Sequence, residues 1–219
     1  MAELVWDQLG ERLYETGVDH GVLYIPDAVT GAYDEGVAWN GLVTATESPS
    51  GAEASPQYAD NIKYLNLYSA EEFGLTIEAF TYPPEFAQFN GIVEASPGVL
   101  VGQQARRGFG LSFRSLIGND VDGTDHGYKL HLVYGCMASP SEAAYGTQND
   151  SPEPITFSWE ITTTGVAVTD LKPASQIVID STLVDPADLT AFETILYGAA
   201  ATQPLLPLPD AVIAAFPAV

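Results

Sequence analysis

The clearest pattern along the chain is a strict alternation of apolar and polar positions in two segments, residues 72–80 and 155–163. The apolar positions of the two segments are Phe73, Leu75, Ile77, Ala79, Phe157, Trp159 and Ile161. The positions between them are mostly polar. A period of two places these sets on opposite faces of a strand, which predicts a sheet with one face in the core and the other in water.

Further short runs rich in Val, Ile, Tyr, Phe and Thr are interrupted by Gly, Pro, Asn and Asp, a pattern typical of strands separated by turns. We expect such strands at residues 21–25, 37–39, 42–47, 63–68, 98–104, 108–117, 128–137 and 176–180. The dipeptide Asn40-Gly41 predicts a hairpin between two of them. Because strands do not alternate regularly with helices, the fold class is mainly β without a parallel sheet.

Helical signals are few, and the strongest lies near the C-terminal end. Asp185 is suited to cap a helix that starts with Pro186, and Gly198 is suited to end it. The apolar stripe between them is Leu189, Phe192, Ile195 and Leu196. We expect shorter helical turns at residues 11–14, 83–88 and 210–216.

The length of 219 residues suits one domain with extended arms. Within a single domain over residues 1–219 we expect an N-terminal arm, two long polar loops and a C-terminal extension. Their ranges are 1–20, 48–57, 139–154 and 199–219. Loops of this length that lack structure of their own are usually functional, which makes both candidates for contacts with a neighbour.

The charge balance excludes several partners. Lys and Arg number 7 against 29 Asp and Glu, which gives a net charge of −22, although charged residues are only 16% of the chain. The acidity therefore arises from a shortage of bases. Such a surface cannot neutralise phosphates, so specific binding to DNA and adhesion to anionic membranes are both disfavoured.

Residues with catalytic or metal-binding chemistry do not form a recognisable motif. The single cysteine, Cys136, lies in an apolar run and is expected to be buried. The acidic turn at residues 118–127 lacks the spacing of a calcium loop, and the glycine-rich segment 102–110 lacks that of a phosphate loop. We therefore expect no catalytic residue, cofactor or metal. Without a secretory signal or a long apolar run, we expect assembly in a cytosol.

Five stretches of the chain, in matching order, resemble the major tail proteins of siphophages, particularly those that infect Gram-positive bacteria. They are VAWNGLVTATESPSGAEASPQYADNIKYLNLYSAEEFGLTIEAFTYPPEF, GQQARRGFGLSFRSLIGND, HGYKLHLVYG, SPEPITFSWEITTT and LPLPDAVIAAF. The resemblance implies a tail-tube-type β-sandwich or barrel with a flanking α-helix, and long loops or arms for contacts within and between rings. We expect no additional C-terminal decoration domain.

The same resemblance implies a structural subunit of the virion tail, assembled in the host cytoplasm. Homohexameric rings of such proteins stack into a tube through which viral DNA passes without specific binding. The implied partners are further copies of the chain and the tail tip, tape measure and tail terminator proteins.

The polar positions of the two alternating segments are candidates for the channel wall, because acids and hydroxyls offer DNA no cation. The candidate lumen-facing residues are Glu72, Thr76, Glu78, Ser158 and Glu160, with Thr156 and Thr162 beside them. An acidic, β-rich chain also fits another virion component, such as a tail terminator or capsid decoration protein. A third alternative is a carbohydrate-binding β-sandwich, which would require an acid pair or an aromatic platform in a concave site.

Overall fold

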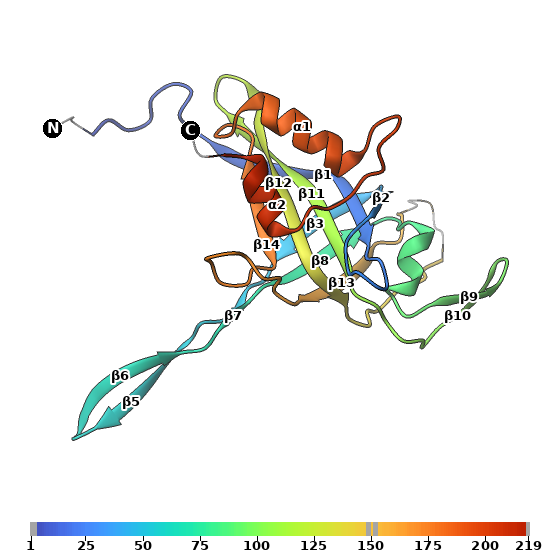
Figure 1. The fold of residues 1–219 in the computed structure, drawn as a ribbon, viewed down its shortest axis with the longest axis horizontal. Coiled ribbons are helices and arrows are strands. Elements are labelled where there is room, and N and C mark those ends of the chain that lie inside the picture. The colour runs from blue at the N-terminus through green and yellow to red at the C-terminus, as the bar shows by residue number, and fades with distance from the viewer. Residues whose placement is uncertain (1–3, 148–149, 151–152, 218–219) are drawn as a thin grey trace.

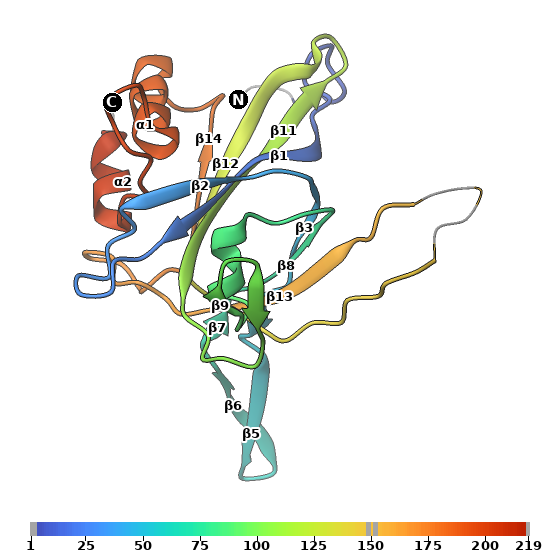
Figure 2. The same ribbon diagram turned by 90° about the vertical axis from the view of Figure 1, so that its right-hand side faces the viewer.

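Two β-layers lie face to face, helices cover one of them, and two hairpins and a loop project from the body (Figures 1 and 2). This computed structural model describes residues 4–147, 150 and 153–217. The layers belong to one 8-stranded antiparallel sheet with the order β2-β1-β11-β12-β13-β8-β3, in which β14 also pairs with β12. Its strands are β1 (Tyr14–Ile25), β2 (Glu35–Trp39), β3 (Leu42–Glu47), β8 (Gly74–Ala79), β11 (Phe109–Asn119), β12 (Gly123–Ala138), β13 (Phe157–Thr163) and β14 (Gln176–Asp180). The prediction of a mainly β fold is confirmed.

A kink in strand β12 divides this sheet into its two layers. Residues 129–133 of β12 pair with β14, whereas residues 136–138 pair with β13. Between them, Gly135 has a φ of 59°, a left-handed conformation that glycine adopts without steric cost. A Cβ at this position would lie 2.2 Å from the carbonyl oxygen of Thr164. The first layer is therefore β2-β1-β11-β12-β14, and the second layer is β13-β8-β3.

The main hydrophobic core fills the space between the layers. Its largest side chains are Trp39, Trp159, Phe86, Phe89 and Phe109, all at most 2% exposed. The 3-10 helix η1 (Pro84–Gln88), which the sequence predicts as a short helix, contributes Phe86. The apolar sets of both alternating segments point into this core, as predicted, although Phe73 and Phe157 are only partly buried.

A second core lies between the outer face of the first layer and two helices, α1 (Pro186–Tyr197) and α2 (Pro209–Ala215). Asp185 caps α1 as predicted, because its Oδ1 accepts a hydrogen bond from the Ala187 amide at 2.8 Å. The buried hydroxyl of Tyr24 donates to the Leu196 carbonyl at 2.8 Å, which ties the first layer to the end of α1. The flanking helix is thus confirmed, but Ile195 of its predicted apolar stripe is 37% exposed.

The prediction of a hairpin at Asn40-Gly41 is wrong. β2 pairs with β1, and β3 pairs with β8, so the two strands that flank this dipeptide lie at opposite ends of the sheet order. Gly41 does adopt a positive φ, of 78°, but it turns the chain from one layer to the other. The turn residues thus bend the chain as expected, while the core between the layers decides which strands pair.

Several expected loops and turns have different structures. Residues 11–14 do not form a helical turn, and residues 14–20 of the expected N-terminal arm belong to β1. The expected loop at 48–57 is replaced by strands of a hairpin. This hairpin and its root comprise β4 (Ser50–Gly51), β5 (Ala54–Ala59), β6 (Ile62–Tyr68) and β7 (Glu71–Glu72).

A second hairpin occupies part of the strand expected at 98–104. It consists of β9 (Val93–Ser96) and β10 (Val99–Val101). The expected loop at 139–154 has no strand or helix where it is described, and its residues 148–149 and 151–152 lie outside the described residues. The C-terminal extension contains α2, and residues 218–219 lie outside the described residues, as do residues 1–3 of the N-terminal arm.

Replacing Gly135 by alanine is expected to destabilise the fold by about 2–4 kcal/mol, because the new methyl group would combine a left-handed backbone with a clash against Thr164. Chemical denaturation measures the free energy of unfolding. Gly102→Ala is the matched control, since a Cβ at Gly102 meets nothing within 4 Å. Equal stability of the two variants would contradict the role assigned to Gly135.

Candidate channel and assembly surfaces

Four of the five candidate lumen residues lie together on the outer face of the second layer. In the register of β13, β8 and β3, Ser158 is opposite Glu78, and Glu78 is opposite Thr44. In the same way Glu160 is opposite Thr76, and Thr76 is opposite Thr46. Residues directly opposed on antiparallel strands point to the same face. We call this set, with Thr162, the polar face.

The polar face carries acids and hydroxyls but no base. Strands β3, β8 and β13 contain no Lys or Arg. The Thr44 hydroxyl donates to Oε2 of Glu78 at 3.2 Å, which orients this carboxylate across the strands. The helices lie on the other side of the molecule, over the first layer (Figure 2). The polar face is therefore a hydrated sheet surface that gives a phosphate no counter-charge.

Two of the predicted polar positions lie elsewhere. Glu72 belongs to β7 at the root of the β5–β6 hairpin, where it pairs with Ser50. It lines a cleft there together with Lys172 and with Thr163 at the end of β13. Thr156 precedes β13. The alternation begins at residue 72, before the start of β8, and sequence alone did not show that the chain changes its pairing partner between β7 and β8.

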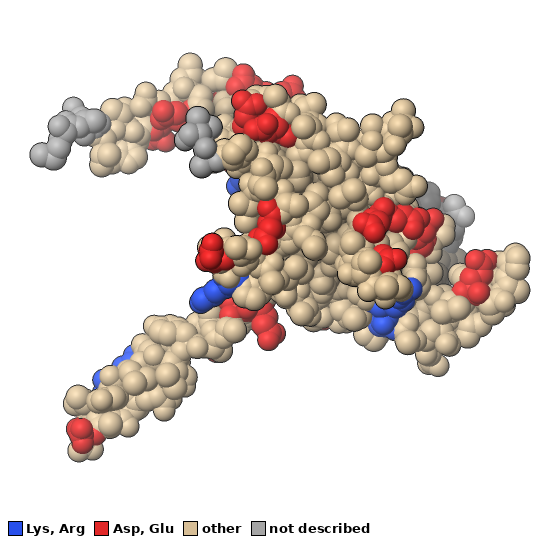
Figure 3. Space-filling model, viewed as in Figure 1, with Lys and Arg blue, Asp and Glu red and all other residues tan. Residues whose placement is uncertain are grey.

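Most of the few basic side chains bind other residues of the same chain. The Arg114 guanidinium holds both oxygens of Asp19, at 2.7 and 2.8 Å, and lowers the pKa of that carboxyl. Lys129 pairs with Glu15, and Arg106 donates to the Ala138 carbonyl at 2.6 Å. Acidic patches therefore spread over the visible surface, with only a few basic atoms among them (Figure 3).

His131, on β12, lies beside Glu47, the last residue of β3. Its ring stacks on Phe113 at a centroid distance of 4.6 Å, and its Nδ1 is 3.3 Å from Oε1 of Glu47. Nε2 lies 2.9 Å from the hydroxyl of Ser115. Burial lowers the pKa of His131, and the nearby carboxylates of Glu47 and Glu15 only partly offset this effect.

Stability should consequently fall as the pH drops below about 6.5, the ordinary pKa of histidine. The folded protein binds a proton at His131 less readily than the unfolded chain does, so protonation favours unfolding. The His131→Asn variant should show a weaker loss of unfolding free energy between pH 7 and pH 5 than the unmodified protein. Identical slopes in denaturation series across this range would exclude a contribution from His131.

The single cysteine lies in the interior of the protein. Cys136 is fully buried, as expected, and burial raises the pKa of its thiol. Among the residues searched, no group of three or more His, Cys, Asp or Glu is arranged to hold a metal ion. No described helix is long and apolar enough to cross a membrane.

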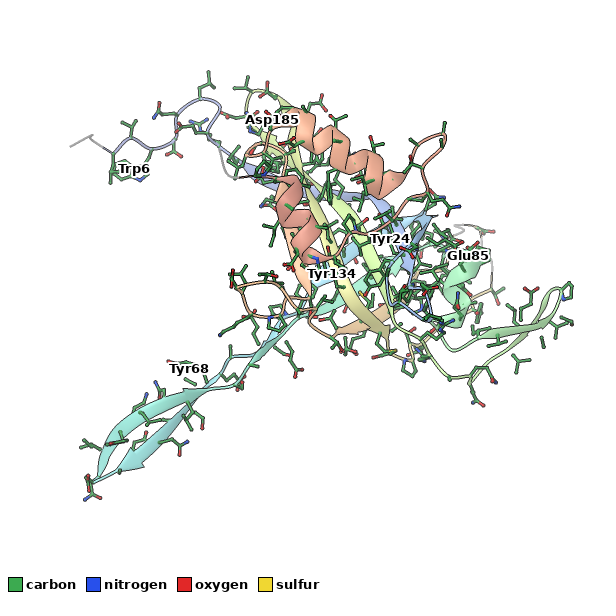
Figure 4. All side chains as sticks on the ribbon, in the orientation of Figure 1. Trp6, Tyr24, Tyr68, Glu85, Tyr134 and Asp185 are labelled. Carbon is green, nitrogen blue, oxygen red and sulfur yellow. The ribbon has the colours of Figure 1, made fainter. Side chains whose placement is uncertain are left out.

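Exposed apolar side chains gather on the projecting segments, a surface that sequence reasoning missed. The β5–β6 hairpin exposes Tyr58, Ile62, Tyr64, Leu65, Leu67 and Tyr68, the β9–β10 hairpin exposes Val93, Val99, Leu100 and Val101, and the N-terminal segment exposes Leu4, Val5, Trp6, Leu9 and Leu13. Trp6 lies well away from the body, and Tyr68 lies toward the base of the β5–β6 hairpin (Figure 4). The signal was present in residues 62–68, where apolar residues occupy both strand faces instead of alternating.

Comparison with known proteins leaves the family open. No family model matches the chain, and no curated protein sequence matches it. Among solved structures, one similar chain belongs to the PVC sheath-tube complex of an extracellular contractile injection system in its extended state. It is 12% identical, with 74% of this chain and 88% of that chain covered, at a TM-score of 0.35. A chain of the anti-feeding prophage (AFP) baseplate is 10% identical, with 82% and 100% covered, at a TM-score of 0.38. Neither TM-score is high enough to establish a common fold.

Proposed function

We propose that this chain is a tail tube subunit of a long-tailed phage, in which homohexameric rings stack into a channel for viral DNA. The observation that carries the proposal is the placement of a base-free polar face opposite the helix-covered face of the same layered body. A ring of such subunits can turn the polar face inward and the helices outward. Its wall then offers DNA no cation at which transit would stall.

The edges of the second layer suit closure of a ring. Among the described residues, β3 pairs only with β8, and β13 pairs with β12 through three residues, 136–138. Free strand edges readily pair with another chain. A contact between different edges of identical subunits is heterologous, and it produces a closed ring when the rotation closes. In this arrangement the second layers of neighbouring subunits join around the channel.

The remaining elements of the proposal are the stack and its partners. The projecting hairpins provide contacts between rings, and the tail tip, tape measure and tail terminator proteins bind the tube. The subunit acts in the virion tail after assembly in the host cytoplasm. The DNA passes without specific binding, because the chain has a net charge of −22.

Negative-stain electron microscopy of the purified protein tests assembly directly. Long tubes of stacked sixfold rings are the expected result, with or without a tail-tip complex as nucleus. Single rings that do not stack would instead indicate a tail terminator. Binding to capsids would indicate a decoration protein, and hits on a glycan array with no polymer would indicate a sugar-binding domain.

The channel assignment is tested by the double change Glu78→Lys and Glu160→Lys. Tubes should still assemble, because neither side chain belongs to a core and surface substitutions usually change stability by about 0.5 kcal/mol or less. Genome ejection should slow, and more so at low salt, where added cations attract the DNA phosphates most strongly. Glu85→Lys, an exposed change on η1, is the control and should leave ejection unchanged. Equal ejection rates in both variants at every salt concentration would remove these residues from the channel wall.

A further inference from the structure

The β5–β6 hairpin, here called the arm, lacks the support that its own structure requires. Its strands pair only with each other among the described residues, and its root, β4–β7, pairs two residues on each side. A two-stranded hairpin alone is marginally stable in water at best. The arm projects clear of the body (Figure 1). Its stabilising contacts must therefore come from outside the subunit.

Both faces of the arm carry large apolar side chains. Ser55 is opposite Leu67 and Gln57 is opposite Leu65, which places the two leucines on one face. Ala54 is opposite Tyr68 and Pro56 is opposite Asn66, which places Tyr68 on the other. Leu65, Leu67 and Tyr68 are 40%, 56% and 66% exposed. Strands with large apolar residues on both faces are typical of sheets that are covered on both sides.

The arm also differs in charge from the rest of the chain. Residues 54–68 contain one acid, Asp60, and one base, Lys63, in a protein of net charge −22. No salt bridge joins Lys63 to a described residue. A neutral segment can approach the acidic surface of another copy without adding repulsion, and Lys63 can meet a carboxylate there. Charge thus favours a further copy of this chain as the partner.

The arm exposes a large apolar area for its size. Tyr58, Tyr64 and Tyr68 are 66–72% exposed. Because about a third of each tyrosine is already buried, covering all three removes roughly 300–500 Å² from water. One partner in a standard protein interface contributes about 800 Å². With the leucines and Ile62 added, the exposed apolar area of the arm approaches one partner's share of a standard interface, so each face would make a small contact that is repeated along the polymer.

We propose that the arm is a two-sided wedge that inserts between two other copies of this chain, with the Leu65–Leu67 face against one copy and the Tyr68 face against the other. The inference rests on the proposed self-assembly and adds to it a specific geometry: each arm joins three subunits. It follows that each face contributes separately to the stability of the polymer.

Two neighbouring residues on opposite faces provide matched variants, Leu67→Gln and Tyr68→Gln. Each is expected to raise the critical concentration for polymerisation at least tenfold, measured by sedimentation of the full-length protein at a series of concentrations. Leu183→Gln is the control, because Leu183 is 83% exposed outside the arm, and it should leave the critical concentration unchanged. Unchanged circular dichroism and thermal midpoints in all variants would verify folding, since the arm lies outside both cores.

The outcomes separate the wedge from the proposed function. A tenfold effect from only one of the two variants would overturn the wedge and leave a one-sided contact within an intact tube. No effect from either would overturn the arm as a contact between copies, while tubes would still support the proposed function. A full-length protein that remains monomeric even with a tail-tip nucleus would refute the proposed function itself.

Discussion

The architecture depends on the left-handed backbone of one residue, Gly135. Strand β12 is long enough to run through both layers, and its kink at Gly135 lets the first half pair with β14 and the second half with β13. The close approach of Thr164 leaves no room for a side chain there. Without the kink, the strands of the second layer would extend the first layer as one sheet. The aromatic residues of the main core would then be covered on one side only.

This division of the sheet gives each surface a separate environment. The inner faces of both layers bury the main core, and the outer face of the first layer is covered by α1 and α2. The outer face of the second layer is the remaining surface of this sheet, and it carries the acids and hydroxyls of the polar face. One bent sheet thus encloses the main core, buries the outer face of its first layer under the helices, and leaves the outer face of its second layer in water. A channel-forming subunit requires these properties.

The charged side chains are also distributed differently over the first layer, the polar face and the arm. The chain has few bases, and three of them neutralise acids on the long strands and their N-terminal approach: Arg114 with Asp19, Lys129 with Glu15, and Arg12 with Asp120. These pairs neutralise carboxylates near the first layer, and no cation lies on the polar face. The arm, by contrast, is neutral and apolar, so the segment that extends farthest toward possible neighbours carries the least repulsion.

The sequence by itself determined the local properties: the mainly β class, the alternation that buries Leu75 and Trp159 and turns Thr76 and Glu160 away from the core, the cap at Asp185, and the shortage of bases. These depend on side-chain periodicity and composition, which act over a few residues.

Only the tertiary structure decided which strands pair. Asn40-Gly41 has the residues of a hairpin turn but joins two layers, Glu72 leaves the polar face because its strand changes partner, and residues 48–57 form part of a hairpin instead of a loop. Pairing between distant strands depends on how the whole core closes, and no short segment carries that information.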